Sequence, residues 1–164
     1  MTYRKRAVTA LGLVSYLVLA LLASVSSHAK EGSVLTIRIA EQQHVLSLSE
    51  LEQLPQQQAH FKAAWGPEGL WQGVYLHDLL VRFNLEQYQD IRLSALNDYR
   101  IRLTPQEITN GNPILASHFD GEPIPLERNG PFILIWPDQS QQVLDGTAPL
   151  ALWIWSLTEI RVRP

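Results

Sequence analysis

The sequence predicts a β-rich α+β domain with mixed sheets and few short helices, and three observations lead to that class. Apolar and polar residues alternate over several short stretches, which is the period-two pattern of half-buried strands. The helical patterns are brief. Ten prolines lie among the 164 residues, and proline interrupts long helices and central strands. Short strands with a few short helices between them are typical of an α+β domain.

The first part of the predicted domain contains two strand patterns with a short helix between them. Residues 34–40 alternate apolar and polar side chains, as a half-buried strand does. Ser47 or Ser49 then caps a short helix that Pro55 ends. Residues 56–65 suit a second extended segment, which the Gly-Pro pair after it turns.

The middle of the chain begins with a helix and continues with a hairpin. Residues 70–83 start as a turn or strand and run into a helix, because leucine and phenylalanine recur there at helical spacing. Residues 90–95 and 100–103 alternate again on either side of a turn, which predicts a β-hairpin. Pro105 follows at the first position of a capped helical turn.

The last part of the chain is again rich in strand patterns. Residues 114–117 predict a short apolar strand, and the Asp-Gly pair at 120–121 predicts a tight turn. Residues 132–136 are apolar without interruption and predict a central strand that is covered on both faces. The apolar segment 152–157 and the strand pattern 160–163 come last.

The first 29 residues have the pattern of an export signal. Basic residues at 4–6 precede an uncharged stretch at 7–27. Ser27 and Ala29 then form the small-x-small pattern of a signal peptidase site, which puts the expected mature start at Lys30. The alternative is an uncleaved anchor, because the apolar run approaches the ~18 residues that cross a bilayer. Either outcome predicts a periplasmic domain at 30–164.

The charge of the predicted domain excludes two classes of partner. Residues 1–29 contain three of the 13 basic residues and none of the 16 acidic ones, so residues 30–164 carry a formal net charge of −6. An acidic domain without a basic cluster in its sequence argues against nucleic acid and against an anionic membrane surface. A protein or a small molecule is the expected partner.

The sequence contains no cysteine. Disulfides, thiol catalysis, thiolate metal ligation and iron–sulfur clusters are therefore all excluded. The histidines are scattered without metal-ligand spacing, and no Gly-x-Ser-x-Gly or phosphate-loop motif is present. No group of residues is marked as catalytic or as a metal site.

Five segments, in order, resemble elements of the oxidoreductase molybdopterin-binding domain of the sulfite-oxidase type. They are Trp-Gln-Gly-Val-Tyr-Leu-His-Asp-Leu-Leu at 71–80, Leu-Ser-Ala-Leu-Asn-Asp-Tyr at 93–99, the segment 114–125, Asn-Gly-Pro-Phe-Ile-Leu-Ile-Trp-Pro at 129–137, and the segment 153–162. In the second, Asp98 replaces the family's glycine or is displaced by one position. Together the segments cover nearly all of 30–164 and imply the family's fold.

The missing cysteine is the main departure from that family. The family's enzymes ligate molybdenum through a cysteine sulfur, and serine or histidine replaces a soft thiolate poorly. Small exported proteins of this fold that lack the thiolate are associated with binding free pterins and with relaying that signal to membrane receptors that control cyclic-di-GMP turnover. The resemblance therefore implies a pterin ligand, the periplasmic part of a membrane receptor as partner, and no molybdenum.

Aromatic and acidic residues at loop positions are the candidate ligand contacts. A pterin is a flat bicyclic ring, so a protein binds it by stacking an aromatic side chain and by placing a carboxylate against its N–H groups. Trp65 in a loop and Trp136 at a strand end are candidates for stacking, with core packing as the alternative for each. Asp98 and Asp138 are the candidate carboxylates, with simple turn chemistry as the alternative.

Three further residues complete the predicted site. Tyr99 offers an aromatic edge or a hydroxyl, and Asn97 offers an amide that orients the ring. Arg128 lies in a polar loop and is either a ligand contact or a solvated surface residue. Trp71, Trp153 and Trp155 are expected to be mainly structural, because large aromatic side chains are usually buried.

Two other classes of function compete with the pterin-binding interpretation. One is a molybdopterin-dependent oxidoreductase with a non-cysteine ligand set. The other is a purely structural interaction module whose pocket is vestigial. Molybdenum in the purified protein would indicate the oxidoreductase rather than a binding protein. A response to pterins would indicate a binding protein rather than the interaction module.

Overall fold

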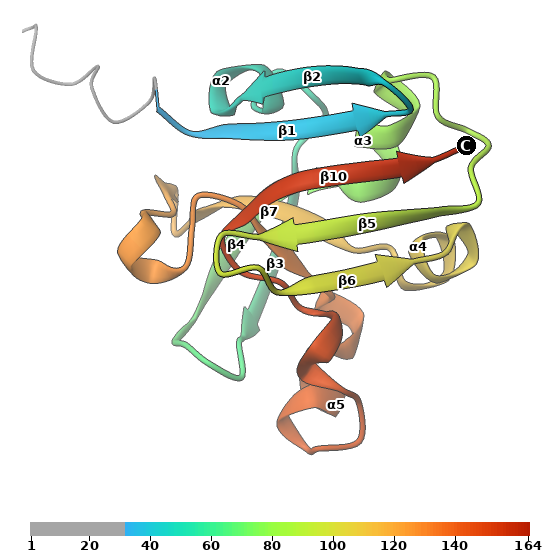
Figure 1. The fold of residues 1–164 in the computed structure, drawn as a ribbon. Coiled ribbons are helices and arrows are strands. Elements are labelled where there is room, and N and C mark those ends of the chain that lie inside the picture. Colours follow the sequence, from blue (N-terminus) through green and yellow to red (C-terminus); the bar gives the residue numbers. More distant parts are fainter. Residues whose placement is uncertain (1–31) are drawn as a thin grey trace, which may run out of the picture. The chain divides into compact units, whose positions relative to one another are not determined.

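Two β-sheets carry the fold of residues 32–164, the part of the chain that this computed structural model describes (Figure 1). The expected export segment, residues 1–29, lies outside the described residues. Within 32–164, no helix has both the length and the apolar character to cross a membrane.

Sheet A is a mixed sheet of five strands in the order β2-β1-β10-β5-β6. The strands are β1 (Val34–Ile39), β2 (Gln42–Ser47), β5 (Asp90–Ala95), β6 (Arg100–Leu103) and β10 (Leu157–Arg163). β10 pairs parallel with β1 and antiparallel with β5, so the strand that comes latest in the sequence lies in the middle of the sheet. The hairpin expected from the two alternating stretches is present as β5 and β6.

Sheet B is antiparallel and follows the order β3-β4-β7-β8, with β9 also paired to β7. The strands are β3 (Gln57–Lys62), β4 (Glu68–Tyr75), β7 (Ile114–Phe119), β8 (Glu122–Pro123) and β9 (Ile133–Ile135). Asp120 and Gly121 both have positive φ, 51° and 84°, in the turn from β7 to β8. This is the conformation that an Asp-Gly pair favours in a two-residue hairpin turn.

Short helices lie between the strands. The α-helices are α2 (Leu48–Leu51), α3 (Leu76–Arg82), α4 (Pro105–Gly111) and α5 (Ser140–Leu144), and the 3-10 helices are η2 (Leu126–Arg128), η3 (Pro137–Gln139) and η4 (Leu150–Leu152). Ser47 and Thr104 each form a reciprocal capping box with the glutamate three residues later. The two helix starts that the sequence indicates are therefore confirmed, with Ser47 as the cap of the first.

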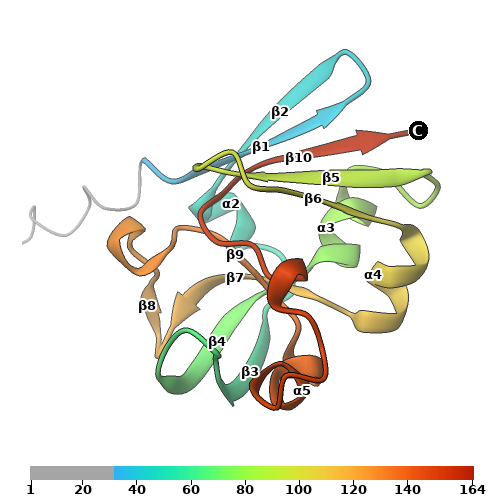
Figure 2. The same cartoon turned by 60° about the horizontal axis from the view of Figure 1, so that its bottom comes forward.

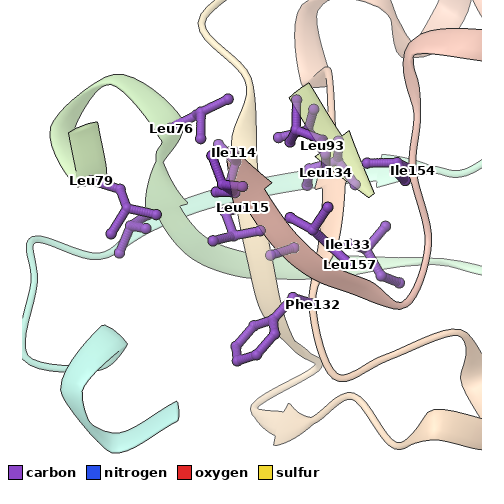
Figure 3. Close-up of a cluster of buried hydrophobic side chains, with 14 of the residues drawn as sticks. Leu76, Leu79, Leu93, Ile114, Leu115, Phe132, Ile133, Leu134, Ile154 and Leu157 are labelled. Carbon is purple, nitrogen blue, oxygen red and sulfur yellow. The ribbon is translucent and has the colours of Figure 1, made fainter. Parts of the chain in front are cut away.

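The core lies between the inner faces of the two sheets. In Figure 2, sheet A runs along the top, and sheet B and helices α2, α3 and α4 lie on one side of it. Leu93 and Leu157 of sheet A and Leu115 and Leu134 of sheet B are fully buried there (Figure 3). At roughly 25 cal/mol per Å² of apolar surface, burial of such side chains is the main stabilising contribution in a chain without disulfides.

The structure differs from the sequence-based expectations mainly near the end of the chain. β9 has three residues rather than the expected five, and it pairs with β7 near one side of sheet B. β10 begins at Leu157 rather than at the expected Ile160, so it is three residues longer at its start. The shorter β9 arises because burial alone makes a segment apolar, whether or not its backbone pairs as a strand.

Glu159 joins the two parallel strands of sheet A. Its carboxylate accepts a hydrogen bond from Arg38 Nε at 2.5 Å and another from Arg161 Nε at 3.3 Å. Burial raises the pKa of Glu159, but the hydrogen bonds from the two arginines outweigh it, so the pKa lies below the ordinary value of 4.5.

The lowered pKa of Glu159 predicts a pH-dependent contribution to stability. A carboxyl group whose pKa is lower in the folded state stabilises above its unfolded-state pKa, and the contribution is lost as the pH falls through the folded-state pKa. The Glu159→Gln variant should therefore have a lower free energy of unfolding than the wild type at neutral pH, and the difference should shrink below pH 4.5. Urea denaturation across this pH range measures it. Glu86→Gln, at an exposed position, is the control, and an equal pH dependence in both variants would contradict the assignment.

Candidate functional site

Six aromatic rings, three from strands of sheet B and three from loops, form one cluster, called the aromatic cluster. Its members are Phe61, Trp65, Trp71, Phe119, Trp153 and Trp155. Trp65 lies at its centre. Its ring meets those of Trp155, Trp153 and Trp71 edge to face, with centroid distances of 5.1, 5.2 and 6.0 Å. Such edge contacts each contribute about 0.5–1.5 kcal/mol beyond area burial.

The segment before β10 is attached at two points, which fixes the position of Trp155 in the cluster. Ser156 has a positive φ of 49°, and its N–H donates to the Asn129 carbonyl at 2.7 Å. The Ser156 carbonyl accepts from the Leu96 N–H at 2.9 Å, at the start of the β5–β6 turn. These two hydrogen bonds place Trp155 beside the β5–β6 hairpin on one side and near the loop around Asn129 on the other.

The first hollow beside the cluster, the Tyr99 hollow, has a volume of about 280 Å³. It is lined by Ala95, Asn97, Tyr99, Leu150, Ala151, Trp153 and Trp155. Ligand sites commonly have volumes of roughly 300–1,000 Å³, so this hollow suits a small ligand of one or two rings. Its wall is mostly apolar, and its polar groups come from the hairpin turn.

The polar groups of the Tyr99 hollow have defined partners. Tyr99 donates its hydroxyl proton to the Ala151 carbonyl at 2.8 Å, which ties the hairpin turn to η4. Asn97 Oδ1 accepts from the Tyr99 backbone N–H at 3.2 Å, the geometry of an Asx turn. Within residues 32–164 the Asn97 side-chain NH₂ has no partner, so it remains a donor for a ligand.

The second hollow, the Arg128 hollow, lies against Trp65 and Trp71 and has a volume of about 140 Å³. It is lined by Trp65, Gly66, Pro67, Trp71, Phe119, Ile124, Arg128 and Asn129. The Arg128 guanidinium lies 5.1 Å from the centroid of the Phe119 ring, a cation–π contact. This hollow is half the size of the first and suits at most part of a bicyclic ligand.

Three indole N–H groups of the cluster are buried without an acceptor. They belong to Trp71, Trp153 and Trp155, and none has a hydrogen-bond partner within the described residues. An unsatisfied buried donor costs about 1–3 kcal/mol.

The structure brings four of the seven predicted site residues to these two hollows. Asn97 and Tyr99 line the Tyr99 hollow, and Trp65 and Arg128 line the Arg128 hollow. Because Trp65 also touches Trp155, the two pairs belong to one continuous aromatic surface.

The other three predicted residues lie elsewhere. Asp98 occupies the left-handed position of the turn, with a φ of 64°, and its exposed carboxylate pairs with Arg100 at 3.2 Å. Asp138 is exposed within η3. Trp136 is only 1% exposed and donates its indole N–H to the Leu152 carbonyl at 2.9 Å, which makes it a core residue. Neither hollow is lined by a carboxylate, so the expected acid contact to a pterin is not part of them.

Sequence reasoning gave too little weight to Trp155, Trp153 and the η4 residues Leu150 and Ala151. Trp71 and Trp153 are buried as expected, at 4% and 1% exposure, but Trp153 also contributes to the hollow wall. A signal for them existed in the sequence. Trp153 and Trp155 have one residue between them, so in an extended segment their side chains point to the same face, and this spacing indicates an aromatic surface that the two rings share.

A buried polar group lies outside both hollows. Ser117 Oγ and His118 Nδ1 are 3.0 Å apart, and His118 Nε2 is 3.3 Å from Glu52 Oε1. These side chains connect the end of α2 to β7. Ser117 is 1% exposed, so it has no access for a substrate, and the group serves as a structural connection.

The donor atoms of this chain do not fit the molybdenum site that the fold family implies. That site needs a thiolate, and the sequence has no cysteine at any position. Within residues 32–164, no three His, Asp or Glu side chains gather as a potential metal site. The walls of the Tyr99 hollow are aromatic, amide and phenol groups, which suit an organic ring rather than a metal ion.

Comparison with known proteins agrees with the fold. No protein-family model matches the chain, and no curated protein matches its sequence. Among solved structures, it is similar to the sulfane dehydrogenase SoxCD from Paracoccus pantotrophus, with a TM-score of 0.61 at 15% sequence identity. The similarity covers 82% of this chain and 39% of that one, so the chain spans about two fifths of its structural neighbour. The described residues therefore form a strand-rich α+β domain with a distant similarity to the sulfite-oxidase-type molybdopterin oxidoreductase fold.

Proposed function

We propose that this protein is an exported, periplasmic ligand-binding protein that binds a pterin in the Tyr99 hollow and performs no molybdenum chemistry. The observation that carries the proposal is the composition of that hollow. Tryptophan rings and an asparagine–tyrosine turn surround about 280 Å³, in a fold whose enzymes need a cysteine that this sequence lacks.

The hollow supports the proposal by offering one of the two contacts expected for a pterin, an aromatic stack, and by offering an amide and a hydroxyl in place of the expected carboxylate. The flat ring stacks on an aromatic side chain, and a base–aromatic stack of this kind contributes about 1–3 kcal/mol. The aminopyrimidinone edge presents a carbonyl and an amino group. The Asn97 NH₂ donates to the carbonyl, and the Tyr99 hydroxyl oxygen, whose proton goes to Ala151, accepts from the amino group.

The proposal extends to a relay of the ligand signal. The loaded domain is read by the periplasmic part of a membrane receptor that controls cyclic-di-GMP turnover. The support for this step is the resemblance of the five sequence segments to the molybdopterin-binding family, because small exported members of that fold without the thiolate are associated with pterin binding and relay. The acidic charge of residues 30–164 supports a protein partner over nucleic acid.

Tryptophan fluorescence of the purified protein tests ligand binding, because all five tryptophans lie within the described residues. The titrants are 6-hydroxymethyl-7,8-dihydropterin, its oxidised form, and lumazine, a bicyclic control without the amino group. Saturable quenching by a pterin but not by lumazine, without molybdenum in the sample, supports the proposal. Molybdenum in protein from a cofactor-competent host would favour the enzyme. If no pterin changes the tryptophan fluorescence and the sample contains no molybdenum, the result favours the structural interaction module.

The Trp155→Ala variant is expected to bind the dihydropterin about 5- to 150-fold more weakly, which corresponds to the 1–3 kcal/mol of a lost stack. Trp155→Phe keeps a ring at the position and should retain most of the affinity. Arg128→Gln changes the other hollow and should leave the dissociation constant unchanged. If Arg128→Gln weakens binding and Trp155→Ala does not, the ligand occupies the Arg128 hollow instead.

A further inference from the structure

Four arginines form a straight row across sheet A, here called the arginine row: Arg38 of β1, Arg161 of β10, Arg92 of β5 and Arg102 of β6. They are successive register partners, since Arg38 pairs with Arg161, Arg161 with Arg92, and Arg92 with Arg102. Adjacent strands are about 4.8 Å apart, so the row extends over about 14 Å. The four arginines lie far apart between positions 38 and 161 of the sequence, so the row is recognised only when the strand pairing is known.

The row lies on the outer face of sheet A. The residues on either side of these arginines in their strands, such as Ile37, Leu93 and Ile160, are buried in the core, so the arginines point the other way. The side chains of Arg38, Arg102 and Arg161 are 39%, 53% and 56% exposed. In Figures 1 and 2, none of the helices drawn in colour covers this face of the sheet.

The row is only partly neutralised by its own neighbours. Glu159 bonds Arg38 and Arg161, and Asp90 pairs with Arg102 and Arg163. Arg92, in the middle, has no ion pair or hydrogen bond with any described residue. Like charges directly opposite each other destabilise a sheet. Arg92 therefore contributes no stabilising ion pair within the sheet.

The charge of the described residues is strongly segregated. Residues 32–164 contain nine basic residues, and six of them, with Arg100 and Arg163 added to the row, lie on this face. Asp90, Asp98 and Glu159 are the acidic residues beside them, which gives the face a net charge of +3. The remaining residues carry three basic and 12 acidic side chains, a net charge of −9. One basic face on an otherwise acidic domain selects the orientation of a charged partner.

We propose that the outer face of sheet A docks an acidic surface of a partner protein, whose carboxylates pair with Arg92 and its neighbours in the row. Guanidinium groups bind carboxylates with two parallel hydrogen bonds, and a rigid sheet holds several of them at fixed spacing. This surface is separate from the ligand hollows. The inference goes beyond the proposed function and does not depend on pterin binding.

A protein fits this face better than a phosphate polymer or an anionic membrane. Glu159 and Asp90 lie among the arginines and would repel a uniform array of phosphates. A protein can offer carboxylates opposite Arg92 and donors opposite the two resident acids.

The test compares binding of four probes to the purified full-length protein by a salt-dependent titration. The probes are a helical peptide that repeats Glu-Ala-Ala-Ala-Glu, its glutamine analogue, duplex DNA, and vesicles that contain phosphatidylglycerol. The acidic peptide is expected to bind at low salt, with weaker binding at high salt, and the other three are not. No binding of the acidic peptide at low salt, or tighter binding of DNA or vesicles, overturns the proposal. Salt-sensitive self-association would assign the face to a second copy of this chain and would also overturn it.

Charge reversal at the centre of the row gives the sharpest variant. Arg92→Glu should weaken binding of the acidic peptide by about tenfold or more. Lys62→Glu, an exposed basic residue on β3 of sheet B, makes the same charge change and should leave peptide affinity unchanged. Because Arg92 lies between two arginines, Arg92→Glu should unfold at the same temperature as the wild type or higher. An equal loss of affinity in both variants, or a lower unfolding temperature for Arg92→Glu alone, would count against a docking role.

Discussion

Replacement of Gly73 by alanine is expected to lower the free energy of unfolding by about 3 kcal/mol. Gly73 lies in β4 at a break in the register with β7, where the two backbones approach closely. A Cβ atom there would lie 2.0 Å from the Leu115 carbonyl oxygen and 2.7 Å from the Ala116 Cα. Both are backbone atoms of a buried strand, so the clash is relieved only by displacing β7.

Urea denaturation measures this effect, and Gly66→Ala is its matched control. No heavy atom lies within 4 Å of a Cβ at Gly66, so that variant should change the free energy of unfolding by less than about 0.5 kcal/mol. Similar values for the two variants would show that the backbones of β4 and β7 lie too far apart at Gly73 for a Cβ atom to clash.

Trp136→Ala is expected to cost about 3–5 kcal/mol of unfolding free energy, the range for removal of a large buried aromatic side chain. Trp136 is 1% exposed, and its indole N–H donates a hydrogen bond to the Leu152 carbonyl at 2.9 Å. Leu152 ends η4, which supplies Leu150 and Ala151 to the Tyr99 hollow. Loss of the ring therefore removes core packing and loosens one wall of the proposed ligand site.

The Trp136→Phe variant separates these two contributions. It keeps an aromatic ring but removes the donor to Leu152, so it should cost only about 1–2 kcal/mol. Thermal and urea unfolding of both variants give the values. If Trp136→Ala kept its stability and lost only pterin binding, Trp136 would be a ligand contact, as the sequence allowed, rather than a core residue.

Local chemistry explains which parts of the fold were predictable. Alternating patterns identified β1, β5, β6 and most of β10, and capping residues placed the starts of α2 and α4, because these signals lie within a few neighbouring residues. β2 and α5 were missed, since neither has a strong periodicity of its own. The apolar run ending at Trp136 gave too long a strand, because the core buries side chains regardless of backbone pairing.

The site was less predictable than the fold, because it depends on contacts between distant segments. Asn97 and Tyr99 were selected from their turn, but only the Leu96–Ser156 hydrogen bond shows that Trp155 faces them. Asp98 was selected with them because its side chain is acidic. A turn of this shape uses that residue for its left-handed backbone and directs its carboxylate to Arg100. Sequence position alone does not reveal this difference between neighbours.

The central place of β10 in sheet A determines when the domain can assemble during synthesis. β10 separates β1 from β5, and its Glu159 bonds Arg38 across 121 residues of chain. Until residues 157–163 leave the ribosome, the nascent chain holds only two isolated hairpins of this sheet, and such hairpins are marginal in water. The apolar faces around Leu35 and Leu93, which the folded domain buries, therefore wait for the last strand of the sheet before they can be covered in full.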